Sequence, residues 1–417
     1  MQKHNDFVDY IKNVCSQIRI KQVHSDIEQE LMCHMQEQKQ TYIDNGTDDR
    51  IAIQKTIEDM GDPIIIGGQL DQTHRPKPNK KLVLFASIMI AFAVFMQLFL
   101  LQTPYYWISL SIGVALCFAF YYMDYTFLAK YAWLLFGLFF VLGLAILLTN
   151  LSSFVLLFVP AYCGILYKMK SKRYLGLGIS FAVMLAPVLG IMLLPSFIMA
   201  LVIGLVCFIL LLIAVVKEWF GVKKGVGMLL VIMPIAIFII LLFNNLADFQ
   251  LYRLTSMFAG DSFIAQSTNE MMQGVQAMGE SHTINASYQL DALRSSESIL
   301  VYILANYGAI PTAAICAGII TFVIVMFYIA RKQKNTFAAM LSYGCAITYC
   351  VQCVIFLASN LFAHLGFFNG TPFLFGSNSM VITNMILLGV FLSASKWDGI
   401  VSEKALFKRN TVAQSSR

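Results

Sequence analysis

The residue of this chain whose type and position could do chemistry is Glu297. It ends a long polar segment, and mostly apolar and small residues follow it as far as Ile310. A carboxylate where a chain enters a membrane is costly unless it is paired, solvated or used. A carboxylate placed in this way can take a proton from a reacting group. Glu297 is therefore the first candidate for an acid–base residue.

The same residue has a second interpretation. Glu297 follows Ser295 and Ser296 at the predicted start of a helix. Acidic residues at that place are common, because the amide dipoles of the first turn stabilise them by about 0.3–1 kcal/mol. Both interpretations remain open at this point.

The composition assigns the chain to the membrane proteins. Of its 417 residues, 58% are hydrophobic and 12% are charged, and the mean hydropathy is +0.71. A soluble globular protein has roughly a quarter charged residues. We therefore predict an all-α polytopic membrane protein, and we attribute the net charge of +6 to topology rather than to nucleic-acid binding.

Ten apolar segments are long enough to cross a bilayer, which takes about 20 helical residues. They are predicted at 82–101, 105–123, 128–149, 151–167, 174–194, 197–216, 226–243, 298–329, 336–359 and 379–395. The predicted domains are a helical prefix domain at 1–73, a basic, proline-containing linker at 74–81, the transmembrane domain at 82–396 and a tail at 397–417.

Lysine and arginine gather in alternate short loops, and such loops face the cytoplasm by the positive-inside rule. We therefore expect a multi-pass protein of the plasma membrane with both termini in the cytoplasm. The long segments 244–297 and 360–378 would lie outside. The basic loops would face anionic lipid head groups.

The prefix segment reads as short amphipathic helices. Ser25-Asp26-Ile27-Glu28 has the pattern of a capping box that opens a helix. A second helix is predicted from Asp48 to Met60, Gly61 would end it, and Asp62-Pro63 would begin the next. No metal-type spacing joins the histidines and cysteines of this segment, and we predict no metal site.

Four segments of the rest of the chain resemble, in order and spacing, the motifs of the SEDS proteins (FtsW, RodA and SpoVE). These segments are Leu194–Ile203, Tyr252–Leu254, Glu297–Ile310 and Pro372–Ser379, with Gly389 and Ser393 following in the last span. The prefix, with Met60-Gly61-Asp62-Pro63 as its clearest part, is similar to the permease prefix domains, which implies a regulatory or partner-binding role.

The SEDS resemblance implies polymerisation of peptidoglycan glycan strands from lipid II or a related undecaprenyl-linked precursor, beside a class B penicillin-binding protein. Glu297 holds the position of the catalytic acidic residue. It would take the proton of the acceptor hydroxyl, while cationic groups or a divalent cation offset the leaving pyrophosphate. Cofactor use is otherwise unknown. The substrate-binding candidates are Arg253, Arg294, Asp261, Asp291, Ser196, Ser377 and Asn378.

These candidates also have plainer interpretations. Arg253 and Arg294 are the only basic residues of the segment 244–297 apart from histidine, and either could instead anchor the loop at lipid phosphates. Asp261 and Asp291 read more simply as solvated loop charges.

The chain departs from the family pattern at several positions. Ser196 stands where the relatives have aspartate, Glu297 replaces their catalytic aspartate, and Ala305-Asn306 replace their paired glutamates. A shift of one methylene in a catalytic group can lower a rate strongly. Two alternatives to the polymerase therefore stay open: an inactive relative that acts as a membrane scaffold or regulator, and a transporter of a lipid-linked precursor. The scarcity of ionisable residues in the first six spans argues against the transporter.

Overall fold

The computed structural model describes residues 5–21, 23–76, 78–96, 106–146, 152–192, 197–244, 255, 274–281, 299–360, 370–371, 375–376 and 378–398. The chain forms two compact units. One consists of Met1–Pro78 with Gln333–Thr336 and Lys396–Arg417, and the other consists of Asn79–Lys332 and Phe337–Ser395.

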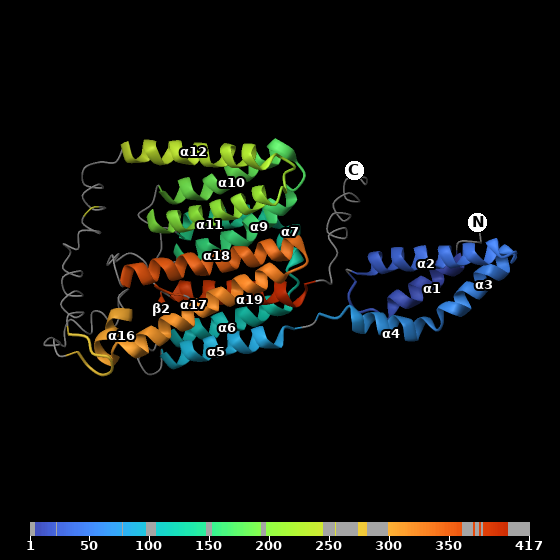
Figure 1. Cartoon of the computed structure of the whole chain (residues 1–417), viewed down its shortest axis with the longest axis horizontal. Helices are drawn as coiled ribbons and strands as arrows, with labels where there is room; N and C mark the ends of the chain where they lie inside the picture. The colour runs from blue at the N-terminus through green and yellow to red at the C-terminus, as the bar shows by residue number, and fades with distance from the viewer. Residues whose placement is uncertain are drawn as a thin grey trace. The chain divides into compact units, whose positions relative to one another are not determined.

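The first unit contains four helices, drawn in blue in Figure 1. They are α1 (Asn5–Ser16), α2 (His24–Asp44), α3 (Asp49–Met60) and α4 (Pro63–Thr73). Their apolar faces enclose a small core of buried side chains, among them Tyr10, Val14, Ile27, Leu31 and Met35. The predicted face of Ile27, Leu31 and Met35 is thus the buried face of α2.

The helix ends follow the predicted punctuation with one exception. The side chains of Asp48 and Asp62 accept hydrogen bonds from the backbone N–H groups of Arg50 and Ile64, as N-caps do. The capping box at Ser25 is wrong, because α2 begins at His24 and its N-cap is Val23, which makes no side-chain cap.

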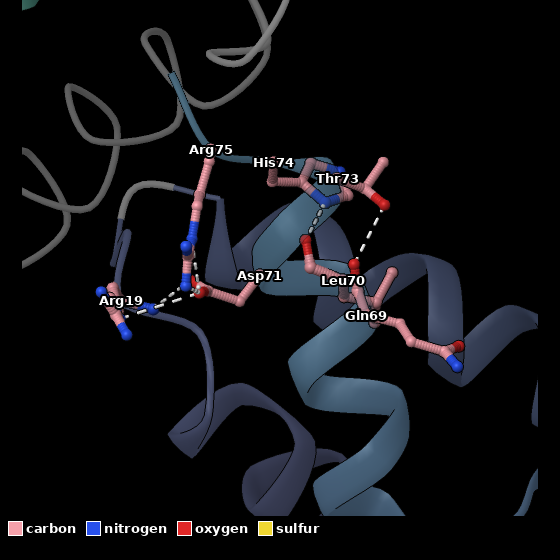
Figure 2. Close-up of polar contacts among 7 residues, drawn as sticks. All are labelled: Arg19, Gln69, Leu70, Asp71, Thr73, His74 and Arg75. Carbon is pink, nitrogen blue, oxygen red and sulfur yellow. Dashed lines mark hydrogen bonds and ion pairs between the residues drawn. The ribbon is translucent and has the colours of Figure 1, made fainter. Parts of the chain in front are cut away.

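Asp71 fixes the end of α4 to the turn after α1, as Figure 2 shows. Its carboxylate is 5% exposed and pairs with Arg75 at 2.7 Å, and it accepts the backbone N–H of Arg19 at 3.0 Å. That backbone hydrogen bond, together with the Arg75 guanidinium, lowers the pKa of Asp71. The negative charge of the Asp71 carboxylate is therefore well compensated at the end of α4.

The second unit is a bundle of apolar helices (Figure 1). In chain order these are α5 (Lys80–Met96), α6 (Tyr106–Tyr122), α7 (Thr126–Lys130), α8 (Ala132–Ile146), the short 3-10 helix η3 (Ser152–Leu157), α9 (Phe158–Lys168), α10 (Arg173–Met192), α11 (Phe197–Val216), α12 (Lys224–Asn244), α16 (Ile299–Tyr307), α17 (Ala309–Lys332), α18 (Thr336–Ala358) and α19 (Asn378–Lys396). Two strands of two residues, β1 (Gly370–Thr371) and β2 (Phe375–Gly376), pair antiparallel before α19.

As far as the described residues extend, each of the ten apolar segments expected from the sequence corresponds to one helix or to consecutive helices. Among the described residues, α17, α18, α19 and the part of α11 from Met199 to Val216 are long and apolar enough to cross a membrane, and several shorter apolar helices accompany them. The all-α polytopic membrane fold is confirmed. The eighth span, expected as one helix over 298–329, is divided at Gly308 into α16 and α17.

Most of α18 and most of α19 are buried inside the bundle, whereas most of α17 is not. The Tyr349 hydroxyl of α18 donates to the carbonyl oxygen of Asn384 in α19 at 2.5 Å. Farther along α19, a Cβ at Gly389 would lie only 2.6 Å from the Cys117 carbonyl oxygen of α6. This close approach of backbones is typical of helix contacts in membranes.

Candidate functional site

The start of α16 is held by a side chain from the end of α18. The Oδ1 atom of Asn360 accepts the backbone N–H of Leu300 at 3.1 Å. Asn360 is 0% exposed, and its Nδ2 atom donates to the Phe356 carbonyl oxygen at 3.0 Å. The first amides of a helix have no partner within the helix. Asn360 therefore satisfies one of these amides, that of Leu300, in a buried place. Leu300 follows Glu297 by three residues in the sequence.

The far end of α16 is a break in the helix at Gly308, where φ is +94°. A Cβ at this position would lie 2.7 Å from the Met278 Cα and 2.8 Å from the Ala277 carbonyl oxygen. Only glycine adopts such a φ without cost and leaves room for another backbone at that distance. The segment 274–281 thus passes directly against the break.

Four backbone hydrogen bonds join this segment to both sides of the break. Ser281 and Gly279 donate to the carbonyl oxygens of Ala305 and Tyr307, at 2.8 and 3.2 Å. In the opposite direction, Ala309 and Ile310 donate to the carbonyl oxygens of Gln276 and Ala277, at 3.0 and 3.1 Å. The last carbonyls of α16 and the first amides of α17 are the groups that a broken helix leaves unpaired. The segment 274–281 supplies their partners.

The helix α16 is therefore held at both ends by parts of the chain that are distant in sequence. Asn360 holds its start, and 274–281 holds its end. The side chains of Ile299, Leu300, Val301 and Ile303 are buried, so the helix also packs into the unit. Packing and hydrogen bonds together thus hold α16 in one geometry.

One of the predicted substrate-binding residues, Asn378, lies among the described residues, at the start of α19. Asn378 is exposed, and its Oδ1 atom accepts the hydroxyl of Ser109 in α6 at 3.1 Å. The next polar residues turn inward, since Ser379 and Thr383 are buried. Asn378 thus fixes α19 to α6, and its role towards a substrate stays a prediction.

The other predicted site residues lie outside the described residues. These are the catalytic candidate Glu297 and the binding candidates Ser196, Arg253, Asp261, Asp291, Arg294 and Ser377. Within the described part of the chain, no three histidine, cysteine, aspartate or glutamate side chains come together as metal ligands would. The nine cysteines are free thiols.

The structure adds two buried amides that the sequence analysis did not single out. Gln352 in α18 is 0% exposed and Asn384 in α19 is 2% exposed. Neither side chain has a hydrogen-bond partner within the described part of the chain. Asn384 accepts the Tyr349 hydroxyl on its backbone, and Gln352 follows Tyr349 by three residues. Unpaired amides in a membrane core are costly. The sequence signal that could have identified these two residues is a polar residue in the middle of an apolar span.

The comparisons with known proteins concern the fold. No family model matches the chain, and no curated protein matches it. A solved structure described as "Structural coordination of polymerization and crosslinking by a peptidoglycan synthase complex" is similar with a TM-score of 0.58 and 17% identity, over 76% of this chain and 97% of that one.

Two structures of the rod shape-determining protein RodA from Thermus thermophilus are also similar. The first has a TM-score of 0.52 and 15% identity and covers 76% of this chain and 96% of that one. The second, of a point variant, has a TM-score of 0.52 and 14% identity and covers 76% and 97%. The membrane helices of this chain are therefore similar in fold to RodA.

Proposed function

We propose that this protein polymerises peptidoglycan glycan strands from lipid II or a related undecaprenyl-linked precursor, with Glu297 as the catalytic base. The observation that carries the proposal is the rigid attachment of α16 at both ends, by Asn360 and by 274–281. It supports the segment where the SEDS-like motif has its acidic residue. The similarity in fold to RodA, a rod shape-determining protein, also supports the proposal.

The proposed step is a glycosyl transfer at the membrane surface. Glu297 takes the proton of the acceptor sugar hydroxyl as that oxygen attacks the anomeric carbon of the donor, and the bond to the pyrophosphate breaks. Arg253 and Arg294 offset the charge of the leaving pyrophosphate. Asn378 and Ser377, at the start of α19, with Ser196, Asp261 and Asp291, complete the proposed polar surroundings of the substrate.

The proposed arrangement in the cell follows from the charge pattern. The protein lies in the plasma membrane with both termini in the cytoplasm, and α16 begins at the outer face. A class B penicillin-binding protein is the proposed partner, and cell division, cell shape or sporulation is the proposed setting. The prefix helices α1–α4 would bind a regulator on the inner side.

The test is a polymerisation assay with purified full-length protein and labelled lipid II, alone and with class B penicillin-binding proteins. Glu297→Gln is expected to lower the rate by about 10²- to 10⁴-fold, the usual contribution of a general base. Glu270→Gln is the matched control, because it removes one carboxylate from the same segment, 244–297, at a position with no proposed contact to the substrate, and it should change the rate much less. If the wild-type protein makes no glycan with any partner, the enzyme proposal falls.

A second candidate function is an inactive scaffold for envelope synthesis. The two positions where the relatives have paired glutamates carry local structural contacts here. Ala305 is buried and its carbonyl oxygen accepts the N–H of Ser281, and Asn306 Nδ2 donates to the Tyr302 carbonyl oxygen at 2.9 Å. A scaffold would co-purify with its partner proteins and would make no glycan in the assay. Cells that carry the Glu297→Gln variant would then grow as well as cells that carry the wild-type protein.

A further inference from the structure

Two adjacent turns concentrate positive charge at one end of the second unit. The turn after α9 contains Lys168, Lys170, Lys172 and Arg173 and no acidic residue, and the turn between α11 and α12 contains Lys217, Lys223 and Lys224 with the single carboxylate of Glu218. The backbone N–H of Ser171 donates to the carbonyl oxygen of Trp219 at 2.7 Å. We call residues 168–173 and 217–224 together the basic turns.

The backbone of the basic turns is held in an unusual shape. Ser171, Arg173 and Glu218 have φ values of 70°, 48° and 54°. Residues with a side chain rarely adopt positive φ, and they keep it only where the surrounding structure imposes it. The lysines are thus presented by two fixed turns rather than by loose loops.

An aromatic layer lies directly under these lysines. Tyr167 and Trp219 are buried, with ring centroids 6.1 Å apart. The ammonium nitrogen of Lys170 lies 5.9 Å from the first ring and 5.6 Å from the second. Lys217 is similarly placed, 5.0 Å from the ring of Tyr343 in α18. Cation–π contacts attract the ammonium group to the face of the ring and so fix its position.

The charge of the basic turns is not balanced from within. Glu218 lies 3.6 Å from Lys224, and it is the only carboxylate in the two turns. Lys172, Arg173 and Lys223 are exposed. Exposed apolar residues continue the surface along the helices, with Tyr174 at 58%, Leu175 at 69% and Val226 at 42% exposure. Cations therefore stand at the rim of an apolar helix surface.

We propose that the basic turns bind the head group of an anionic phospholipid. The cations would contact the phosphate, and the acyl chains would lie along Tyr174, Leu175 and Val226. Clustered basic residues between membrane helices bind anionic lipid in this way, and long basic side chains at helix ends reach towards phosphates. A soluble anion would use the cations and leave the apolar surface unused. This site is independent of the proposed polymerase activity.

The experiment is native mass spectrometry of the full-length protein in detergent, titrated with palmitoyl-oleoyl phosphatidylglycerol or with the phosphatidylcholine of the same acyl chains. The wild-type protein should retain phosphatidylglycerol in preference to phosphatidylcholine. Each lysine near an anionic lipid contributes about a fivefold factor, so Lys172→Gln combined with Lys223→Gln should weaken its retention by about 25-fold. Lys172→Arg combined with Lys223→Arg should retain it.

The matched control is Arg331→Gln combined with Lys332→Gln, which removes the same charge from an exposed basic pair at the end of α17. It should leave the retention within about twofold. Equal retention of the two lipids by the wild type would overturn the proposal, as would equal losses in the two glutamine pairs. Displacement of phosphatidylglycerol by millimolar inorganic phosphate would also overturn it, because the site would then be one for free anions. Unchanged thermal unfolding of each variant shows that folding is not the cause.

Discussion

The Oδ1 atom of Asn360 lies 3.1 Å from the backbone nitrogen of Leu300, and 60 residues of sequence separate them. The contact joins the end of α18 to the first turn of α16. It is buried, so water cannot replace the acceptor if the side chain is lost. The position of the first turn of α16 therefore depends on a residue that is distant in sequence.

Asn360→Leu should lower both stability and polymerisation. The change keeps a similar volume but leaves the Leu300 N–H without its acceptor, which costs about 1–3 kcal/mol. Thermal unfolding and the lipid II assay measure the two effects. Ser359→Ala is the control, because the Ser359 hydroxyl donates within its own helix, to the Phe356 carbonyl oxygen. Equal behaviour of the two variants would show that the contact with Leu300 does not matter.

Gly308→Ala should release the segment 274–281 from the break between α16 and α17. An alanine there combines a φ of +94° with a Cβ 2.7 Å from the Met278 Cα. The φ alone costs about 1–2 kcal/mol, and the contact adds to it. Hydrogen exchange at Gly279 and Ser281 should become faster. Gly318→Ala is the matched control in α17, since a Cβ there meets nothing within 4 Å; faster exchange in that variant alone would refute the prediction.

Gln352→Met should stabilise the protein or leave its stability unchanged. The Gln352 amide is buried and unpaired among the described residues, and an apolar side chain of similar length removes that cost of about 1–3 kcal/mol. The midpoint of thermal unfolding in detergent measures the change. A clear loss of stability would mean that the amide makes a contact essential to the fold. Glycan synthesis lowered in the stabilised variant would indicate that the buried amide serves the activity.

Asp71→Asn should loosen the N-terminal helices. It removes the ion pair with Arg75 and weakens the bond from the Arg19 N–H. Cys15 reports the opening, because it is buried beside this region, whereas Cys33 is exposed and serves as the internal reference. A loss of about 1–3 kcal/mol should speed maleimide labelling of Cys15 by about 5- to 150-fold. Unchanged labelling would mean that Asp71 is not needed to close the helices.

The labelling of Cys15 should also have a distinctive pH dependence. Burial, with a smaller effect of Glu28, raises its pKa to about 11, while a thiol in an unfolded chain titrates near 8.5. The folded state thus binds the proton of the Cys15 thiol more tightly than the unfolded state does. The contribution of this proton to the free energy of unfolding is complete below about pH 8.5 and is lost as the pH rises towards 11. Between these values the rate for Cys15 should climb more steeply than the rate for Cys33. Parallel profiles would contradict this.

The sequence by itself determined the class of the protein, the positions of most of its helices and the cap at Asp62. A membrane leaves no partner for backbone groups except within the segment, so the positions of apolar helices can be read from composition and length. Caps act over two or three residues, and such short-range patterns are visible in a sequence. The failed capping box at Ser25 shows their limit, because the preceding turn, with Val23 buried in the core, starts α2 two residues earlier.

Only the tertiary structure decided how α16 is held. The composition of 298–329 favours one continuous helix, and the break at Gly308 exists because the backbone of 274–281 satisfies the groups that the break exposes. Asn360 reads as the polar end of a span, and its role appears only when the end of α18 meets the start of α16. Hydrogen bonds between residues so far apart leave no periodic trace in a single sequence, because they depend on how the helices pack together.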